Sequence, residues 1–177
     1  LFNSVDSVME FLEGTGLAEI FTSRKVKDLV DYVFGIETGL DTNARKNRSG
    51  KIMEATVHNI LMEAGIAHRS EVYSREWPEI TSVLGDDEKR FDFVIETPSK
   101  VYLMEVNFYS GGSKLNEVAR SYSDISPKIN SVPGFEFIWI TDGKGWNSAR
   151  NKLQEAFSII PGVYNLTSIY QFIESIK

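Results

Sequence analysis

Residues 91–108, FDFVIETPSKVYLMEVNF, decide the fold that this sequence predicts. Two apolar runs, residues 91–96 and 101–108, flank Pro98 and Ser99 in this stretch. Short apolar runs rich in Val, Ile, Phe and Tyr and separated by turn residues are typical of buried strands joined by a tight turn. We therefore expect a buried β-hairpin over these residues.

The alternation of side chains along the two strands predicts which polar groups share a face. In the first strand, one face should carry Asp92, Val94 and Glu96, and the other Phe91, Phe93 and Ile95. In the second strand, one face should carry Leu103, Glu105 and Asn107. A hairpin that closes symmetrically about Pro98 and Ser99 pairs residues whose numbers sum to 197, as those of Asp92 and Glu105 do. The Cβ atoms of this pair would then lie ~5 Å apart, and a slip of one residue would separate them.

Two carboxylates at this spacing predict a metal site. Like charges in otherwise apolar strands repel one another and lose hydration, which pushes one of them toward protonation unless a counter-charge is present. A divalent cation removes the conflict, and carboxylate oxygens suit Mg²⁺. The alternative is structural: Asp92 would face solvent at a strand end, and Glu105 would pair with a basic neighbour.

A third acid, Glu54, lies on a predicted helix that precedes the hairpin. The helix is indicated by apolar residues spaced as on one helical face, which are Met53, Val57, Ile60, Leu61 and Ala64. Packed on the sheet, this helix could present Glu54 to the same metal. The alternative is an ordinary acid in a first helical turn, where the helix dipole favours it.

The segments before the hairpin are predicted to be mostly helical. We expect two short helices in residues 1–35, a polar loop over residues 36–50, the helix that carries Glu54, and a strand over residues 67–73. A loop that contains Pro78 then leads into the hairpin.

The segments after the hairpin alternate between helix and strand. We expect a helix through Leu115 that Pro127 interrupts or restarts, a strand over residues 135–141, a helix through Leu153 and a last helix from Thr167. This order predicts an α/β fold, with a mixed central sheet flanked by helices and helical additions at both ends of the chain.

Composition restricts the chemistry that the chain can support. Its 177 residues include 19 Lys and Arg, 25 Asp and Glu, no Cys and two His, with a formal net charge of −6. This length suits one soluble globular domain. The absence of cysteine excludes disulfides, cysteine zinc sites and thiol nucleophiles, so any metal site must be built from oxygen. The acidic balance argues against non-specific coating of nucleic acid, although local basic clusters can still bind it.

The sequence contains no signal for a membrane. No run approaches the ~18 consecutive apolar residues of a membrane span, and the first residues lack the basic and apolar regions of a signal peptide. We therefore expect a cytoplasmic protein. The chain begins without methionine, which suggests processing or a fragment of a longer protein.

Basic and glycine-rich segments offer candidate contacts to DNA. The first segment contributes Arg45, Lys46, Asn47, Arg48 and Lys51. Helix N-termini bind phosphate, and Arg and Asn side chains can read base edges. Ser113 and Lys114 follow a glycine pair at a second helix start, and Lys144 lies in a third loop. The alternatives are a solvated charged loop for the first segment and a simple strand-to-helix connection for the second.

Several of these residues together resemble a known nuclease core. Asp92, Glu105 on the next strand and Glu54 on the preceding helix resemble the PD-(D/E)xK nucleases, in which a helix, three strands, a helix and a strand follow in that order. Three segments resemble more specifically the DpnII/MboI family of type II restriction endonucleases: residues 39–50, 105–117 and 137–143.

This resemblance implies a function and a domain organisation. The implied function is Mg²⁺-dependent cleavage of double-stranded DNA at GATC, on the 5′ side of the guanine, with restriction blocked by adenine methylation. A palindromic target suggests a two-fold homodimer. The implied organisation is one nuclease domain over residues 1–177, with a helical part in residues 1–35 and the catalytic core in residues 38–170.

The resemblance also implies roles for the site residues. Asp92 and Glu105 would hold Mg²⁺, and Glu54 would add a ligand or position its water. Asn107 stands where a lysine usually follows the glutamate by two residues. Asn107 would orient the nucleophile, and Lys114 or a second metal ion would supply the missing charge. The alternatives are a non-catalytic DNA-binding module with a nuclease-like fold and, more weakly supported, an α/β interaction domain.

Overall fold

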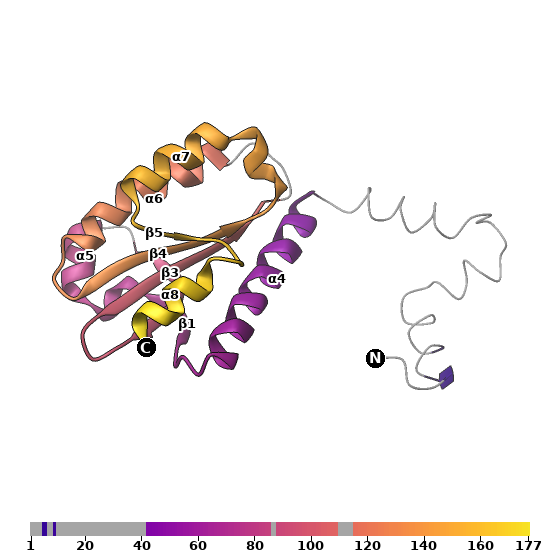
Figure 1. Cartoon of the computed structure of the whole chain (residues 1–177), viewed down its shortest axis with the longest axis horizontal. Helices are drawn as coiled ribbons and strands as arrows, with labels where there is room; N and C mark the ends of the chain where they lie inside the picture. Colours follow the sequence, from indigo (N-terminus) through magenta and orange to yellow (C-terminus); the bar gives the residue numbers. More distant parts are fainter. Residues whose placement is uncertain (1–4, 7–8, 10–41, 86–87, 110–114) are drawn as a thin grey trace. The chain divides into compact units, whose positions relative to one another are not determined.

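The computed structural model describes residues 5–6, 9, 42–85, 88–109 and 115–177 (Figure 1). The chain divides into two compact units, residues 1–45 and 46–177, and the sheet belongs to the second. Residues 5, 6 and 9 are helical, whereas the rest of the two helices predicted in residues 1–35 lies outside the described residues. The organisation as one nuclease domain stays a prediction.

A mixed five-stranded sheet forms the centre of the second unit, which confirms the predicted α/β class. Its strands lie in the order β1 (Arg69–Tyr73), β2 (Arg90–Glu96), β3 (Val101–Phe108), β4 (Phe135–Asp142) and β5 (Gly162–Tyr164). The pairs β1–β2 and β2–β3 are antiparallel, whereas β3–β4 and β4–β5 are parallel. Parallel neighbours need a crossover connection, and α6 (Leu115–Asn130) lies in the connection between β3 and β4.

Helices cover both faces of this sheet (Figure 1). One face packs against α4 (Thr42–Glu63) and α8 (Ile169–Ile176), and the other against α5 (Pro78–Leu84), α6 and α7 (Arg150–Ile159). Two 3₁₀ helices, η1 (Ser74–Glu76) and η2 (Lys144–Ser148), follow β1 and β4. Within the described ranges, no helix combines the length and the apolar character that crossing a membrane requires.

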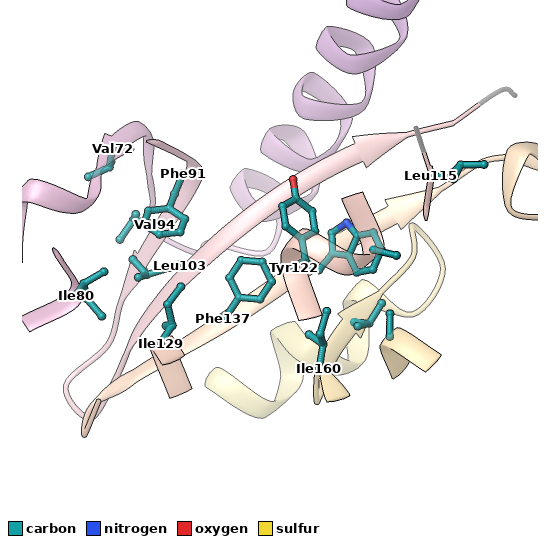
Figure 2. Close-up of a cluster of buried hydrophobic side chains, with 14 of the residues drawn as sticks. Val72, Ile80, Phe91, Val94, Leu103, Leu115, Tyr122, Ile129, Phe137 and Ile160 are labelled. Carbon is teal, nitrogen blue, oxygen red and sulfur yellow. The ribbon is translucent and has the colours of Figure 1, made fainter. Parts of the chain in front are cut away.

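The buried side chains form one cluster on each face of the sheet. Figure 2 shows the cluster on the α6 face, in which Tyr122 of α6 lies beside Phe137 of β4, with ring centroids 5.5 Å apart. The cluster on the α4 face contains the predicted helical stripe of Met53, Val57 and Leu61. Burial of each such large apolar side chain contributes about 1.5–3 kcal/mol, so the two clusters fix the helices on the sheet.

The β2–β3 hairpin has the register that the turn predicts. The pairs are Phe93 with Met104, Val94 with Leu103, Ile95 with Tyr102, and Glu96 with Val101, and the numbers of each pair sum to 197. The ladder ends at Phe93 and Met104, and the next residues beyond it are Asp92 and Glu105.

The predicted face of Phe91 is wrong. Phe91 packs in the same cluster as Val94, whereas Phe93 packs in the other cluster. The β1–β2 ladder is interrupted at Glu71, opposite Asp92, and Glu71 has a φ of 54°. Regular alternation along β2 is lost at this irregular position, for which the sequence pattern contains no signal.

Four other elements differ from the sequence prediction. α4 begins at Thr42, so residues 42–50 are helical, although they lack the apolar stripe that predicts a helix. α5 was not predicted because Pro78 is typical of a loop, yet proline is also favoured in the first turn of a helix, where it lies here. α6 continues through Pro127, which lies near its C-terminal end. β5 has three residues, too few for an alternating pattern.

The ends of β3 and β4 are held together beside Gly143. The backbone N–H of Tyr109 donates to Asp142 O at 2.9 Å, and the N–H of Gly145 donates to Tyr109 O at 2.8 Å. Gly143 has a φ of 118°, and a Cβ atom added there would overlap the backbone of Tyr109. This close approach therefore requires glycine.

Candidate active site

Asp92 and Glu105 come together where the β2–β3 ladder opens. The last ladder pair on this side is Phe93 with Met104, so the two acids are the next residues along the two strands, close enough for the charge of Glu105 to act on Asp92. Asp92 Oδ2 accepts a hydrogen bond of 2.7 Å from the backbone N–H of Val106. The Asp92 carboxylate therefore spans the gap between the strands and binds the backbone next to Glu105.

The two carboxylate oxygens of Glu105 have different partners. The residue is 5% exposed, and the hydroxyl of Tyr122 donates to its Oε2 at 2.6 Å. Lys89 Nζ lies 2.7 Å from its Oε1. The direction of that contact is not that of a hydrogen bond, and Oε1 accepts none from the residues described. One oxygen is thus fixed by a neutral donor, whereas the other faces a positive charge.

The surroundings of Asp92 favour its protonated form. Burial, with the charge of Glu105 as the second cause, raises the pKa of Asp92 from 3.8 to about 6. The Val106 N–H and the charges of Lys89 and Arg90 act in the opposite direction. At neutral pH the strands therefore hold two negative charges close together at an energetic cost, which is the conflict that the sequence predicts.

Glu54 of α4 lies within electrostatic reach of the same pair. Burial raises the pKa of Glu54, and the charges of Asp92 and Glu71 raise it further. Arg90 and Lys51 lower the pKa, but the net direction is upward. The helix that was predicted to carry a third acid toward the strands therefore does bring Glu54 near Asp92.

The donor set in this region suits a hard cation. Carboxylate oxygens are the ligands that Mg²⁺ prefers, and the buried Oε1 of Glu105 has the Lys89 ammonium as its one partner among the described residues. Among the residues that the structure describes, no group of three or more His, Asp or Glu side chains lies close enough together to hold a metal ion. The metal roles of Asp92, Glu105 and Glu54 stay predictions.

Asn107 lies two residues beyond Glu105 on β3. Its Oδ1 accepts a hydrogen bond of 3.0 Å from Trp139 Nε1. Because an indole N–H is a donor only, the amide oxygen of Asn107 must face Trp139. The amide nitrogen of Asn107, which is a donor, then lies on the other side of the group, where it can bind an oxygen of a ligand.

The predicted DNA contacts fall in three segments. The first turns of α4, rather than a loop, contain Arg45, Lys46, Asn47 and Arg48. Lys51 on α4 and Lys144 at the start of η2 are exposed. Ser113 and Lys114 lie outside the described residues.

Two residues that contact Glu105 were missed by the sequence reasoning. Tyr122 lies on the apolar face of the helix expected after Leu115, but a buried tyrosine hydroxyl needs a partner, and this rule could have drawn attention to it. Lys89 lies in the loop before β2, where no periodicity shows the direction of a side chain. The structural alternative for Glu105, a basic neighbour, did indicate such a cation without identifying it.

Comparisons with known proteins found relatives over almost the whole chain. The family model described as DpnII restriction endonuclease matches residues 1–175. The chain is 54% identical to the type II restriction enzyme MboI of Moraxella bovis, over 99% of the chain and 63% of the relative. It is 45% identical to the type II restriction enzyme DpnII of Streptococcus pneumoniae, over 94% of the chain and 62% of the relative.

A more distant relative shows similar coverage. The chain is 40% identical to the type II restriction enzyme MjaIII of Methanocaldococcus jannaschii, over 93% of the chain and 61% of the relative. The chain thus spans about three fifths of the length of these curated relatives. No solved structure matches the chain.

Proposed function

Because the chain belongs to the DpnII restriction endonuclease family, we propose that it makes metal-dependent double-strand cuts in DNA at unmethylated GATC. The observation that carries this proposal is the close approach of Asp92 and Glu105 at the opening of the hairpin ladder. A buried pair of like charges destabilises a fold unless a ligand neutralises it. The target sequence rests on the resemblance of residues 39–50, 105–117 and 137–143 to restriction enzymes that cut GATC.

We assign Mg²⁺ to Asp92 and Glu105, with Glu54 adding a ligand or positioning a water molecule. The raised pKa of Asp92 supports this assignment, because a bound cation favours the ionised carboxylate, and Glu105 Oε1 already lies in a position that a cation, Lys89, occupies. When bound, Mg²⁺ would lower the pKa of the attacking water and stabilise the negative charge that develops on the phosphate.

The protein's own groups orient the reactants. In hydrolysis a water molecule attacks phosphorus, one P–O bond of the DNA backbone breaks, and the leaving oxygen gains a proton as the water loses one. Tyr122 fixes the Glu105 carboxylate through Oε2. Asn107, held by Trp139, would direct its amide nitrogen toward an oxygen of the phosphate or of the nucleophile.

Basic and neutral polar side chains outside the carboxylate site would bind the DNA backbone and bases. We propose this role for Arg45, Lys46, Asn47, Arg48, Lys51, Ser113 and Lys144. A positive charge near a phosphate contributes to all sequences, whereas Arg and Asn at base edges supply specificity. A palindromic target fits a homodimer, and a cytoplasmic location fits a DNA substrate.

Plasmid cleavage tests this proposal directly. The purified chain is incubated with plasmid that contains GATC sites, with or without adenine methylation, in Mg²⁺ or in EDTA. We expect discrete fragments from the unmethylated plasmid in Mg²⁺ and intact plasmid in the other three conditions. A plasmid from which the GATC sites have been removed is the control for sequence specificity.

The remaining outcomes separate the alternatives. Specific binding to GATC in Ca²⁺ without cleavage in Mg²⁺ would identify a DNA-binding module with a nuclease-like fold. Cleavage that persists in EDTA would rule out the metal role, and cleavage of the GATC-free plasmid would rule out the proposed target.

A further inference from the structure

Lys89 is held in place at the edge of the carboxylate site. Its backbone N–H donates to Ser74 Oγ at 3.0 Å, and its carbonyl accepts a hydrogen bond of 2.7 Å from the N–H of Ser74. Ser74 is itself 1% exposed, so this double contact is anchored in the core. The backbone of Lys89 is therefore fixed three residues before Asp92, and its side chain leaves a defined point beside the site.

The side chain of Lys89 reaches into the site rather than into solvent. Its Nζ lies 2.7 Å from Glu105 Oε1, and its side chain is 30% exposed. The same Nζ lies 5.4 Å from the centroid of the Tyr122 ring and 6.0 Å from that of Phe91, distances at which a cation is attracted to an aromatic face. Tyr122 and Lys89 thus lie against different oxygens of the Glu105 carboxylate. The Lys89 ammonium also lies over the Tyr122 ring.

Arg90 lowers the pKa of Asp92 and Lys51 lowers that of Glu54 through their charges, but among the described residues neither forms an ion pair with Asp92 or Glu105. Arg90 forms its ion pair with Glu71 at 3.2 Å, and the exposed Lys51 lies on α4. Of the Lys and Arg residues that the structure describes, Lys89 is the one that forms an ion pair with Asp92 or Glu105. Glu105 Oε1, the oxygen that Tyr122 does not bind, is thus the oxygen beside which the Lys89 ammonium lies.

We propose that Lys89 supplies the positive charge that Asn107 cannot, by contacting the scissile phosphate from the Oε1 side of Glu105. This inference rests on the proposed function and assigns one residue to it. An ammonium group has three N–H donors, so Lys89 can remain beside Glu105 and still donate to a phosphate oxygen. Asn107 keeps the orienting role, and Lys89 takes the role that the sequence analysis offers to Lys114 or a second metal ion.

Single-turnover cleavage of a GATC duplex at saturating Mg²⁺ tests this assignment. We expect Lys89→Met to lower the rate by about 10²–10³-fold, the scale of losing one electrostatic donor in a preorganised site. Lys89→Arg keeps the charge and should recover most of the rate. Lys100→Met is the matched control, because Lys100 forms an ion pair of 2.6 Å with Glu136 near the turn end of the same hairpin. It should cut at the parent rate.

A second measurement separates chemistry from binding. Affinity for the same duplex in Ca²⁺, measured by fluorescence anisotropy, should change by less than about threefold in Lys89→Met, since a single phosphate contact contributes a small share of DNA affinity. Calorimetric titration with Mg²⁺ should show metal affinity that is unchanged or tighter. Thermal unfolding checks that each variant is folded, and Lys89→Gln replaces Lys89→Met if the latter does not fold.

Three results would overturn the inference. Lys89→Met could cut at the parent rate once Mg²⁺ is saturating, which would make Lys89 a mere counter-ion of the metal-free site. It could lose rate only in proportion to DNA affinity, which would make Lys89 a DNA anchor. Absence of cleavage by the parent chain would instead reject the proposed function, and this inference with it.

Discussion

The two ends of the β2–β3 hairpin contain the same kinds of charged residue in opposite surroundings. At the turn end, Glu96 pairs in register with Val101, and its carboxylate binds Arg69 at 2.6 Å with both side chains about half exposed. At the site end, Asp92 and Glu105 lie beyond the last ladder pair, and Glu105 is buried against Lys89.

This difference shows that surroundings, rather than residue type, decide what a carboxylate does in this sheet. Water screens the exposed pair of Glu96 and Arg69, so the pair contributes little to stability. At the site end, desolvation and a second carboxylate raise the pKa of Asp92 to about 6. Such a shift in a cluster of charged groups is typical of a functional site. The turn therefore determines the register of the hairpin, and this register brings the two carboxylates together at the other end.

The largest expected effect comes from neutralising one acid at the site end. Asp92→Asn and Glu105→Gln should each lower the cleavage rate by at least about 10³-fold, because metal binding contributes several kcal/mol to the transition state. DNA affinity in Ca²⁺ should stay comparable or become tighter, since repulsion from the phosphate is relieved. Glu96→Gln, the same kind of change at the turn end, should cut normally. Substantial Mg²⁺-dependent cutting by either site variant would remove that residue from the proposed role.

The next effect concerns the stability of the metal-free protein. Because the pKa of Asp92 is raised, the native state binds its proton more tightly than the unfolded chain, so parent stability falls as pH rises from 3.8 to about 6. Asp92→Asn removes this loss and should be more stable than the parent above pH 6, by at most about 3 kcal/mol. Urea denaturation in EDTA from pH 4 to 7 measures the difference. A gap between the two proteins that does not change with pH would contradict the shift.

Tyr122→Phe should lower the free energy of unfolding, by less than the gain expected from Asp92→Asn. The change removes the hydroxyl that donates to Glu105 Oε2 at 2.6 Å and leaves the ring in the core. Leaving a buried, charged acceptor without its donor costs about 2 kcal/mol. Tyr170→Phe on α8 is the matched control, since Tyr170 is 53% exposed, and its free energy of unfolding should match that of the parent. Equal stabilities for both variants would show that the Tyr122 hydroxyl does not support Glu105.

The smallest effect is expected at the turn end. Glu96→Gln breaks an exposed ion pair with Arg69, which has a second partner in Glu76 at 2.7 Å. The free energy of unfolding should change by less than about 1 kcal/mol, and less still at high salt. A loss as large as that of Tyr122→Phe would mean that the two ends of the hairpin do not differ as described.

The fold could be predicted where a pattern repeats over enough residues. The apolar runs on either side of Pro98 gave the hairpin and its register, and the stripe that includes Met53 gave the buried part of α4. Residues 42–50 are helical without any apolar stripe, and β5 has three residues, so neither offers a periodic signal. These elements are determined by packing and neighbouring backbone, which the sequence shows only indirectly.

The site could be predicted in part for the same reason. Asp92 and Glu105 face each other because of a register that the turn determines, and Glu54 lies on a helical face that can be counted. Lys89 depends instead on its contact with Ser74, a residue 15 positions earlier in the chain. Tyr122 depends on how α6 crosses the sheet. Long-range contacts of this kind follow from the assembled fold and from no local spacing.

Gly143 places a condition on how sequences of this family are interpreted. Its close approach to Tyr109 ties the end of β4 to the end of β3, two residues beyond Asn107. A gene that encodes every acidic residue of the motif, but alanine in place of Gly143, would look intact to a search for those acids. The methyl group would overlap the backbone of Tyr109 and force apart the ends of β3 and β4, and β3 is the strand that carries Glu105 and Asn107. The residue at the position of Gly143 therefore helps to distinguish a functional nuclease from an inactive homologue.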